Sequence, residues 1–244
     1  MIDTEQPRAI RSFVTRAGRI TAAQVRALEL LWPKYGVEFA ADATAPASAG
    51  AATGAAMRAL DCDALFGRHA PRTLEIGFGN GENLAKMAAA RPERDFLGIE
   101  VHRPGVGRLL LALEDLQMTN VRVICHDAVE VLAGRIPRHC LDEVVILFPD
   151  PWPKKRHHKR RLVQTAFVEL VTERLHPGGV LRMATDWQPY AEEMLVTLTA
   201  NSRLRNLAAA GGYVPRPAER VATRFEKRGE RLGHEVWDLA FRRL

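Results

Sequence analysis

VVILFPDPWPKKRHHKRRLV, residues 144–163, is the stretch that tells most about the fold of this 244-residue chain. Its first five residues, Val144–Phe148, are all apolar, which predicts a strand buried on both faces of a parallel sheet. Three prolines among the next five residues cannot donate to a sheet ladder, so the strand has to end there. Asp150 therefore lies on a stiff turn at the carboxyl end of a strand, where open α/β sheets bind their ligands.

A dense basic run follows the proline turn. Six of the eight residues from Lys154 to Arg161 are Lys or Arg, which equals the whole formal surplus of +6, so the rest of the chain sums to neutral. Charge concentrated in this way is typical of a nucleic-acid contact. A lone basic run is more often a solvated surface, but the stiff turn beside it favours a functional loop. The stretch therefore predicts a small-molecule site next to a polyanion.

Strands and helices alternate on both sides of this stretch. Apolar runs predict further strands at 73–78, 96–101, 121–125, 179–185 and around 237–241. Amphipathic patterns predict a helix through 84–87, one at 106–118 and one that runs from 162 through 171 and is stopped at 177–179. A last helix follows the strand at 179–185 and ends at about 199. This alternation predicts an α/β fold with a doubly wound, mostly parallel sheet and helices on both faces.

We interpret residues 1–60 as an N-terminal extension and residues 61–244 as the main domain. Thr21 and Gln24 form a capping-box pattern, which predicts a helix with Val25, Leu28, Leu31 and Trp32 on one face and its end at Pro33. More than half of residues 40–59 are alanine, which we interpret as a flexible connector.

Several classes of protein are disfavoured. No apolar run reaches the roughly 18 residues of a membrane span, and the N-terminus lacks the apolar core of a signal peptide. Cys62, Cys125 and Cys140 are odd in number and lack CxxC spacing, so neither a disulfide framework nor a zinc site is indicated. We expect a cytoplasmic protein without metal or membrane attachment.

Acidic residues accompany the predicted strands. A glycine turn, which contains Gly77, Gly79 and Gly81, follows the first predicted strand, and Glu75 lies just ahead of it. Three further acids, Glu100, Asp127 and Asp150, stand at the ends of the next three strands. The carboxyl ends of parallel strands lie along one edge, so these acids should converge on one crevice. A single such acid usually caps the next helix. Four carboxylates repel one another, so their ligand should carry positive charge.

This pattern argues against a dinucleotide. The Rossmann fingerprint needs a third glycine, but that position is Glu82, whose charge would oppose a pyrophosphate. S-adenosylmethionine fits better, because it has a sulfonium, an ammonium and a ribose but no phosphate. Glu100 stands where an acid takes the ribose hydroxyls of a nucleoside.

Six segments resemble those of the bacterial tRNA (guanine-N7-)-methyltransferases of the TrmB type, a family of class I S-adenosylmethionine-dependent enzymes. They are RSFVTRAGRIT (11–21), LEIGFGNGE (74–82), FLGIEVHRPGVG (96–107), FPDPWPKKRHHKRR (148–161), ATDWQPYAEEM (184–194) and TRFEKRG (223–229). The resemblance covers the chain from about Arg11 onward, apart from the alanine-rich connector. His158, where a neutral residue such as Asn is expected, is a small departure.

The resemblance implies methyl transfer from S-adenosylmethionine to N7 of the variable-loop guanine of tRNA, with residues 61–244 as the methyltransferase domain. Asp150 would be catalytic, and the cofactor would be bound by Glu75, Gly77, Gly79, Gly81, Glu100, Asp127 and Asp150. The substrate would be bound by Lys154, Asp186, Thr223, Arg224, Phe225 and Glu226. The RNA-binding loop would contain Lys155, Arg156, His157, His158, Lys159, Arg160 and Arg161.

Alternatives stay open at this point. Asp186 with Trp187 could simply cap the following helix, and residues 223–226 could be a polar turn. A non-catalytic tRNA-binding protein on the same scaffold is one competing function, and a nicotinamide oxidoreductase, opposed by Glu82, is another. We expect tRNA as the partner, no obligatory protein partner, and a monomer or homodimer.

Overall fold

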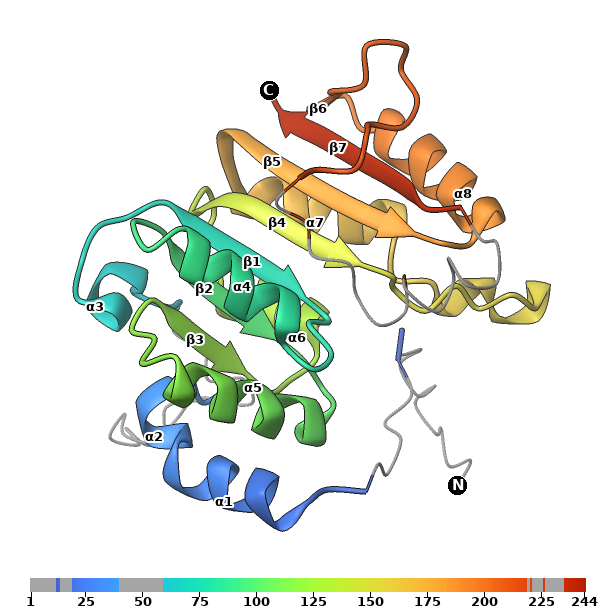
Figure 1. Ribbon diagram of the computed structural model, residues 1–244. Helices are drawn as coiled ribbons and strands as arrows, with labels where there is room; N and C mark the ends of the chain where they lie inside the picture. Colours follow the sequence, from blue (N-terminus) through green and yellow to red (C-terminus); the bar gives the residue numbers. More distant parts are fainter. Residues whose placement is uncertain (1–11, 14–18, 40–58, 219, 221–225, 227–234) are drawn as a thin grey trace, which may run out of the picture.

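The computed structural model describes residues 12–13, 19–39, 59–218, 220, 226 and 235–244, and their architecture is a layered α/β fold (Figure 1). The sheet has the strand order β3-β2-β1-β4-β5-β7-β6. Its strands are β1 (Arg72–Ile76), β2 (Asp95–Ile99), β3 (Val121–Ile124), β4 (Leu141–Leu147), β5 (Leu175–Thr185), β6 (Leu204–Asn206) and β7 (Trp237–Arg243). β1 to β5 pair in parallel, whereas β7 runs antiparallel to β5 and β6. The predicted doubly wound, mostly parallel sheet is confirmed.

Helices cover both faces of the sheet. α4 (Glu82–Ala90) and α5 (Arg103–Asp115) lie on one face with α1 (Ala22–Leu30) outside α5, and α6 (Ala128–Gly134), α7 (Thr165–Arg174) and α8 (Gln188–Thr199) lie on the other (Figure 1). Shorter helices are α2 (Trp32–Tyr35), α3 (Cys62–Phe66) and the 3₁₀ helix η1 (Lys155–Arg160). Among the described residues, no helix is long and apolar enough to cross a bilayer.

The central strands are buried on both sides, as their apolar runs predict. Leu74 of β1 and Val144 of β4 are fully buried in the core against α6, α7 and α8. Phe96 of β2 and Val145 of β4 belong to the core on the opposite face, with α4 and α5. The β1–β2–β4 centre of the sheet is therefore a rigid base for the turns at its carboxyl end.

The N-terminal helix begins as predicted, and Leu28, Leu31 and Trp32 of its predicted face pack against the core, whereas Val25 does not. Thr21 and Gln24 form the capping box, with each backbone N–H donating to the other's side chain. Val25 is 37% exposed, because α1 instead turns the Gln24 side toward α5, where a Cβ on Gly107 would lie 2.8 Å from the Gln24 carbonyl oxygen. Pro33 lies within α2 and does not end α1. The alanine-rich connector, residues 40–58, lies outside the described residues.

Two predicted boundaries were wrong. The helix α7 ends at Arg174, and β5 starts at once and runs through 177–179, where the end of the helix was expected. A Cβ on Gly179 would lie within 2.9–3.1 Å of three carbonyl oxygens, so glycine permits the strand to continue there. β4 ends at Leu147, one residue early, because Phe148 adopts a left-handed conformation with φ 51°.

Candidate active site

The glycine turn between β1 and α4 forms the floor of a crevice. Gly77, Gly79 and Gly81 have φ of 72°, 59° and 76°, in the left-handed region that favours glycine. A Cβ added at Gly77 or Gly79 would meet nothing within 4 Å, so both face open space. A Cβ at Gly81 would lie 2.6 Å from the Leu109 side chain, so this glycine allows α4 and α5 to pack closely. Two of the glycines therefore shape a ligand site, and the third shapes the core.

Glu100, at the end of β2, connects that turn to the neighbouring loop. Its Oε2 accepts the N–H of Gly79 at 2.9 Å, and its Oε1 accepts the N–H groups of Val101 and His102 at 2.7 and 2.9 Å. A carboxylate offers about four lone-pair sites, so one remains for a ligand hydroxyl. Glu100 thus shapes the crevice and retains the capacity to bind ribose.

Glu75 is a buried acid beneath the turn. It is 2% exposed, its Oε1 accepts the Asn83 amide at 3.2 Å, and its Oε2 accepts no hydrogen bond from any described residue. Burial, together with the charge of Glu100, raises the pKa of Glu75 to about 8. Glu75 is therefore protonated near neutral pH in the cofactor-free protein, and a cationic group next to its unpaired oxygen would favour its ionised form.

The crevice itself brings together part of the predicted cofactor site. It is lined by Ser12, Phe13, Ile76, Gly77, Gly79, Ile99, Glu100, Val101, His126, Ala128, Ile146, Leu147, Phe148, Pro149, Asp150 and Leu162. The predicted convergence of four acids is therefore seen only in part: Glu100 and Asp150 line the crevice with Gly77 and Gly79, whereas Glu75 and Asp127 do not. Asp127 lies in an adjoining hollow with Lys159 and Arg160, and it caps α6 by accepting the Val129 N–H at 2.8 Å.

The sequence did not identify Ser12, Phe13 and His126, which line the crevice, or Phe39, which packs behind it. The Phe39 ring stacks on His126, with 3.6 Å between their centroids, and His126 lines the crevice. Ser12 and Phe13 reach the same crevice from the N-terminal extension. An isolated aromatic residue at the edge of a low-complexity segment gives no periodic signal, so only the three-dimensional structure identifies these contacts.

The turn that carries Asp150 is strained on both sides. Phe148 and Trp152, two bulky residues, have φ of 51° and 44°. Each costs roughly 1–2 kcal/mol, and such outliers cluster at functional sites. The Phe148 N–H donates to the Ala184 carbonyl at 2.8 Å, and the indole N–H of Trp152 donates to the Ser12 carbonyl at 3.2 Å. The exposed carboxylate of Asp150 is therefore carried by a backbone that is held from several directions.

The basic run folds into η1 on the rim of the crevice. Lys154, Lys155, Arg156 and Lys159 are exposed, whereas His157, His158 and Arg160 are partly buried. The Arg160 guanidinium lies 5.1 Å from the Trp152 ring, and the His157 ring meets the same indole edge-on at 5.9 Å. Partial desolvation and the charge of Arg156 lower the pKa of His157, so it adds little positive charge near neutral pH.

Arg161 departs from its predicted role. Only 1% of its side chain is exposed, and it pairs with Glu193 and donates to the Pro151 carbonyl at 2.9 Å. The expectation that Arg161 contacts RNA is wrong for this conformation, because the guanidinium faces the interior. Charge patterning alone does not reveal which residue of a basic run turns inward.

The other predicted substrate residues lie on the β5 and β7 side. Asp186 is half-buried directly after β5, and the N-cap of α8 is the next residue, Trp187. Glu226 is 1% exposed, with both oxygens bonded to Arg220 at 2.8 Å and a third contact to Arg216 at 3.0 Å. Thr223, Arg224 and Phe225 lie outside the described residues.

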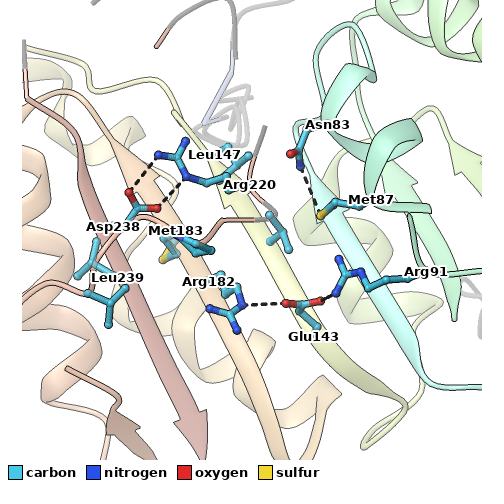
Figure 2. Close-up of a pocket in the computed structure, with 13 residues that line it drawn as sticks. Asn83, Met87, Arg91, Glu143, Leu147, Arg182, Met183, Arg220, Asp238 and Leu239 are labelled. Carbon is cyan, nitrogen blue, oxygen red and sulfur yellow. Dashed lines mark hydrogen bonds and ion pairs between the residues drawn. The ribbon is translucent and has the colours of Figure 1, made fainter. Parts of the chain in front are cut away.

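A second hollow lies on the sheet face between α4 and β7 (Figure 2). Glu143 pairs there with Arg91 at 2.9 Å and with Arg182 at 2.8 Å. Arg220 pairs with Asp238 at 2.9 Å (Figure 2). Each of these charged groups has a partner of opposite sign, which favours a structural role. Among the residues that the structure describes, no group of three His, Cys, Asp or Glu is arranged to hold a metal.

Comparison with known proteins shows the family and supports the fold. Residues 69–239 match a family model described as "Putative methyltransferase". A tRNA (guanine-N(7)-)-methyltransferase of Stutzerimonas stutzeri (strain A1501) is 55% identical over 237 residues, which is 97% of this chain and 93% of the relative. The corresponding protein of Escherichia coli (strain K12) is 54% identical over 237 residues, or 97% and 92% of the two chains. The crystal structure of the 16S rRNA methyltransferase KamB, 16% identical, aligns with a TM-score of 0.51 over 76% of this chain and 94% of that one, which supports the fold.

Proposed function

The chain belongs to the family of tRNA (guanine-N(7)-)-methyltransferases, and from this we propose that it transfers the methyl group of S-adenosylmethionine to N7 of the variable-loop guanine of tRNA. The observation that carries the proposal is the crevice, in which a left-handed glycine turn, Glu100 and Asp150 meet at the carboxyl edge of β1, β2 and β4. We infer a cytoplasmic enzyme that needs no obligatory protein partner and acts as a monomer or homodimer.

The residues of the crevice suit this cofactor. When bound, S-adenosylmethionine supplies an electrophilic methyl group on a sulfonium. Glu100 would hold a ribose hydroxyl through its one remaining lone-pair site, and the unpaired oxygen of Glu75, ionised next to the cation, would accept from the ammonium. Gly77 and Gly79 leave room for the cofactor to approach the backbone, and Asp127 lies at the adjoining hollow. The acids lower the free energy of a cationic ligand and disfavour a pyrophosphate.

The reaction asks for placement rather than for a base. Guanine N7 has an in-plane lone pair and no proton, so the enzyme has only to hold it in line with the methyl group and sulfur. We propose that Asp150 and Asp186 accept hydrogen bonds from the N1–H and exocyclic amine of the base. Their charges also stabilise the positive charge that arises on the methylated ring. Glu226 is a third proposed contact, with its carboxylate held by Arg216 and Arg220.

The basic loop would hold the tRNA. Phosphate contacts from Lys155, Arg156 and Lys159 would position the RNA without reading its sequence, and Lys154 would lie nearest the base. The target guanine has to leave its stacking neighbours to reach the crevice. Thr223, Arg224 and Phe225 complete the proposed substrate contacts.

Transfer of labelled methyl from S-adenosylmethionine to unmodified tRNA, followed by mapping of the modified nucleotide, tests the proposal. The expected product is N7-methylguanine in the variable loop, formed by the wild-type protein and strongly reduced in Asp150→Ala. Binding of tRNA and cofactor without transfer would instead support the alternative of a non-catalytic tRNA-binding protein. Tight binding of NAD in place of S-adenosylmethionine would support the oxidoreductase alternative, which Glu82 at the start of α4 disfavours.

A further inference from the structure

Arg161 ends the basic run, yet its side chain points into the protein. Only 1% of that side chain is exposed, whereas Lys159, two residues earlier, is exposed. Its Nε donates to the Pro151 carbonyl oxygen at 2.9 Å. The Pro151 carbonyl belongs to the peptide that joins Pro151 to the strained Trp152, so this hydrogen bond fixes the backbone directly after Asp150.

The same guanidinium is fixed at its other end by α8. It pairs with Glu193 and lies 4.8 Å from the centre of the Tyr190 ring. These two residues are three positions apart on α8 and share a helix face. The Tyr190 hydroxyl accepts the N–H of Val163 at 3.1 Å, so the backbone just after Arg161 is attached to the same helix.

These contacts are typical of a structural arginine rather than a phosphate contact. Burying a guanidinium removes its hydration, a cost that Glu193 and the Pro151 carbonyl offset here. The planar fork of arginine can serve both partners at once, which the point charge of a lysine cannot. Burial also raises the pKa of Tyr190 to about 12, so the ring beside the guanidinium stays uncharged.

The two segments joined by Arg161 carry two of the three proposed guanine contacts. Asp150 precedes Pro151, and Asp186 lies two residues before the start of α8. We propose that Arg161 is a positioning residue that fixes Asp150 relative to Asp186 during methyl transfer, an inference that rests on the proposed function. It acts through the Asp150 turn and through α8, and it does not contact the tRNA.

The test compares Arg161→Lys and Arg161→Gln with Lys159→Gln, a matched loss of one exposed charge in the same run. Single-turnover methyl transfer is measured with S-adenosylmethionine and tRNA saturating, and tRNA affinity is measured across salt concentrations. Both Arg161 variants should be about 10- to 100-fold slower, because a small misplacement of a reacting group is costly. Their salt slope should remain that of the wild type, whereas Lys159→Gln should lose about one unit of slope.

Two results would overturn the inference. One is a wild-type rate in Arg161→Lys, since lysine would suffice for a phosphate. The other is a loss of salt slope in Arg161→Gln as large as in Lys159→Gln.

Calorimetry with S-adenosylmethionine identifies the folded variants. Should Arg161→Gln fail to fold, Glu193→Gln removes the ion pair from its more exposed partner, 37% exposed, and should slow transfer at an unchanged salt slope. A wild-type rate in Glu193→Gln would refute the positioning role. The wild-type protein tests the proposed function separately, because its failure to methylate tRNA would refute that activity whatever the variants do.

Discussion

Replacing Glu75 with glutamine should remove a large pH dependence from the stability of the cofactor-free protein. Burial raises the pKa of Glu75 from 4.5 to about 8 in the folded state. Between these pH values the folded protein holds a proton on Glu75 and the unfolded chain does not. The free energy of unfolding therefore falls as pH rises, by about 1.4 kcal/mol per pH unit for this group. The contribution is fully present below pH 4.5 and is lost by about pH 8, a total of roughly 5 kcal/mol.

Glutamine imitates the protonated acid, because it is neutral and keeps an oxygen for the Asn83 amide. Urea unfolding of both proteins at pH 5, 6.5 and 8, without cofactor, measures the difference. The Glu75→Gln variant should gain stability relative to the wild type at each step, and by several kcal/mol at pH 8. Glu169→Gln, on the exposed surface of α7, is the control and should follow the wild-type curve. Parallel curves for wild type and Glu75→Gln would refute the reasoning.

Three further outcomes are expected. Asp150→Ala should lose on the order of 100-fold in the single-turnover rate, and Asp150→Asn should retain more activity than Asp150→Ala. If both variants were equally inactive and had lost a pH-dependent limb of the rate profile, Asp150 would be a general base. Neutralising Lys155, Arg156 and Lys159 together should lower the slope of log Kd for tRNA against log salt by about three units, and calorimetry should find cofactor affinity unchanged. Arg220→Gln should lower the free energy of unfolding in urea by about 3–5 kcal/mol, because the buried carboxylates of Glu226 and Asp238 lose their shared counter-ion. Little change there would show that Arg216 alone compensates Glu226.

Much of the fold could be predicted because the central strands are simple in sequence. β1, β2 and β4 are buried on both faces. β2 and β4 contain unbroken runs without polar side chains, 96–99 and 144–147, whereas β1 also contains Thr73 and Glu75. β6 was missed because three residues, Leu204–Asn206, are too few to show a period. The α7–β5 boundary was misplaced because Gly179 is tolerated inside a strand by its particular neighbours.

The site could be predicted only in part. Acids at strand ends converge by topology, so the meeting of Glu100 and Asp150 follows from the order of the strands. Arg161 is buried because it pairs with Glu193, and the local sequence around Arg161 does not predict this distant partner. The contribution of Ser12 and Phe39 depends likewise on contacts more than 80 residues away in the chain.

The position of β7 has a consequence for biosynthesis. β5 and β6 leave the ribosome before β7, yet β7 lies between them, so both present open edges until Trp237–Arg243 emerges. The crevice over β1, β2 and β4 needs none of these residues and can form early. Asp238, which pairs with Arg220 and so supports Glu226, arrives only with β7. A nascent chain should therefore acquire the ability to bind its methyl donor before it can hold the base that receives the methyl group.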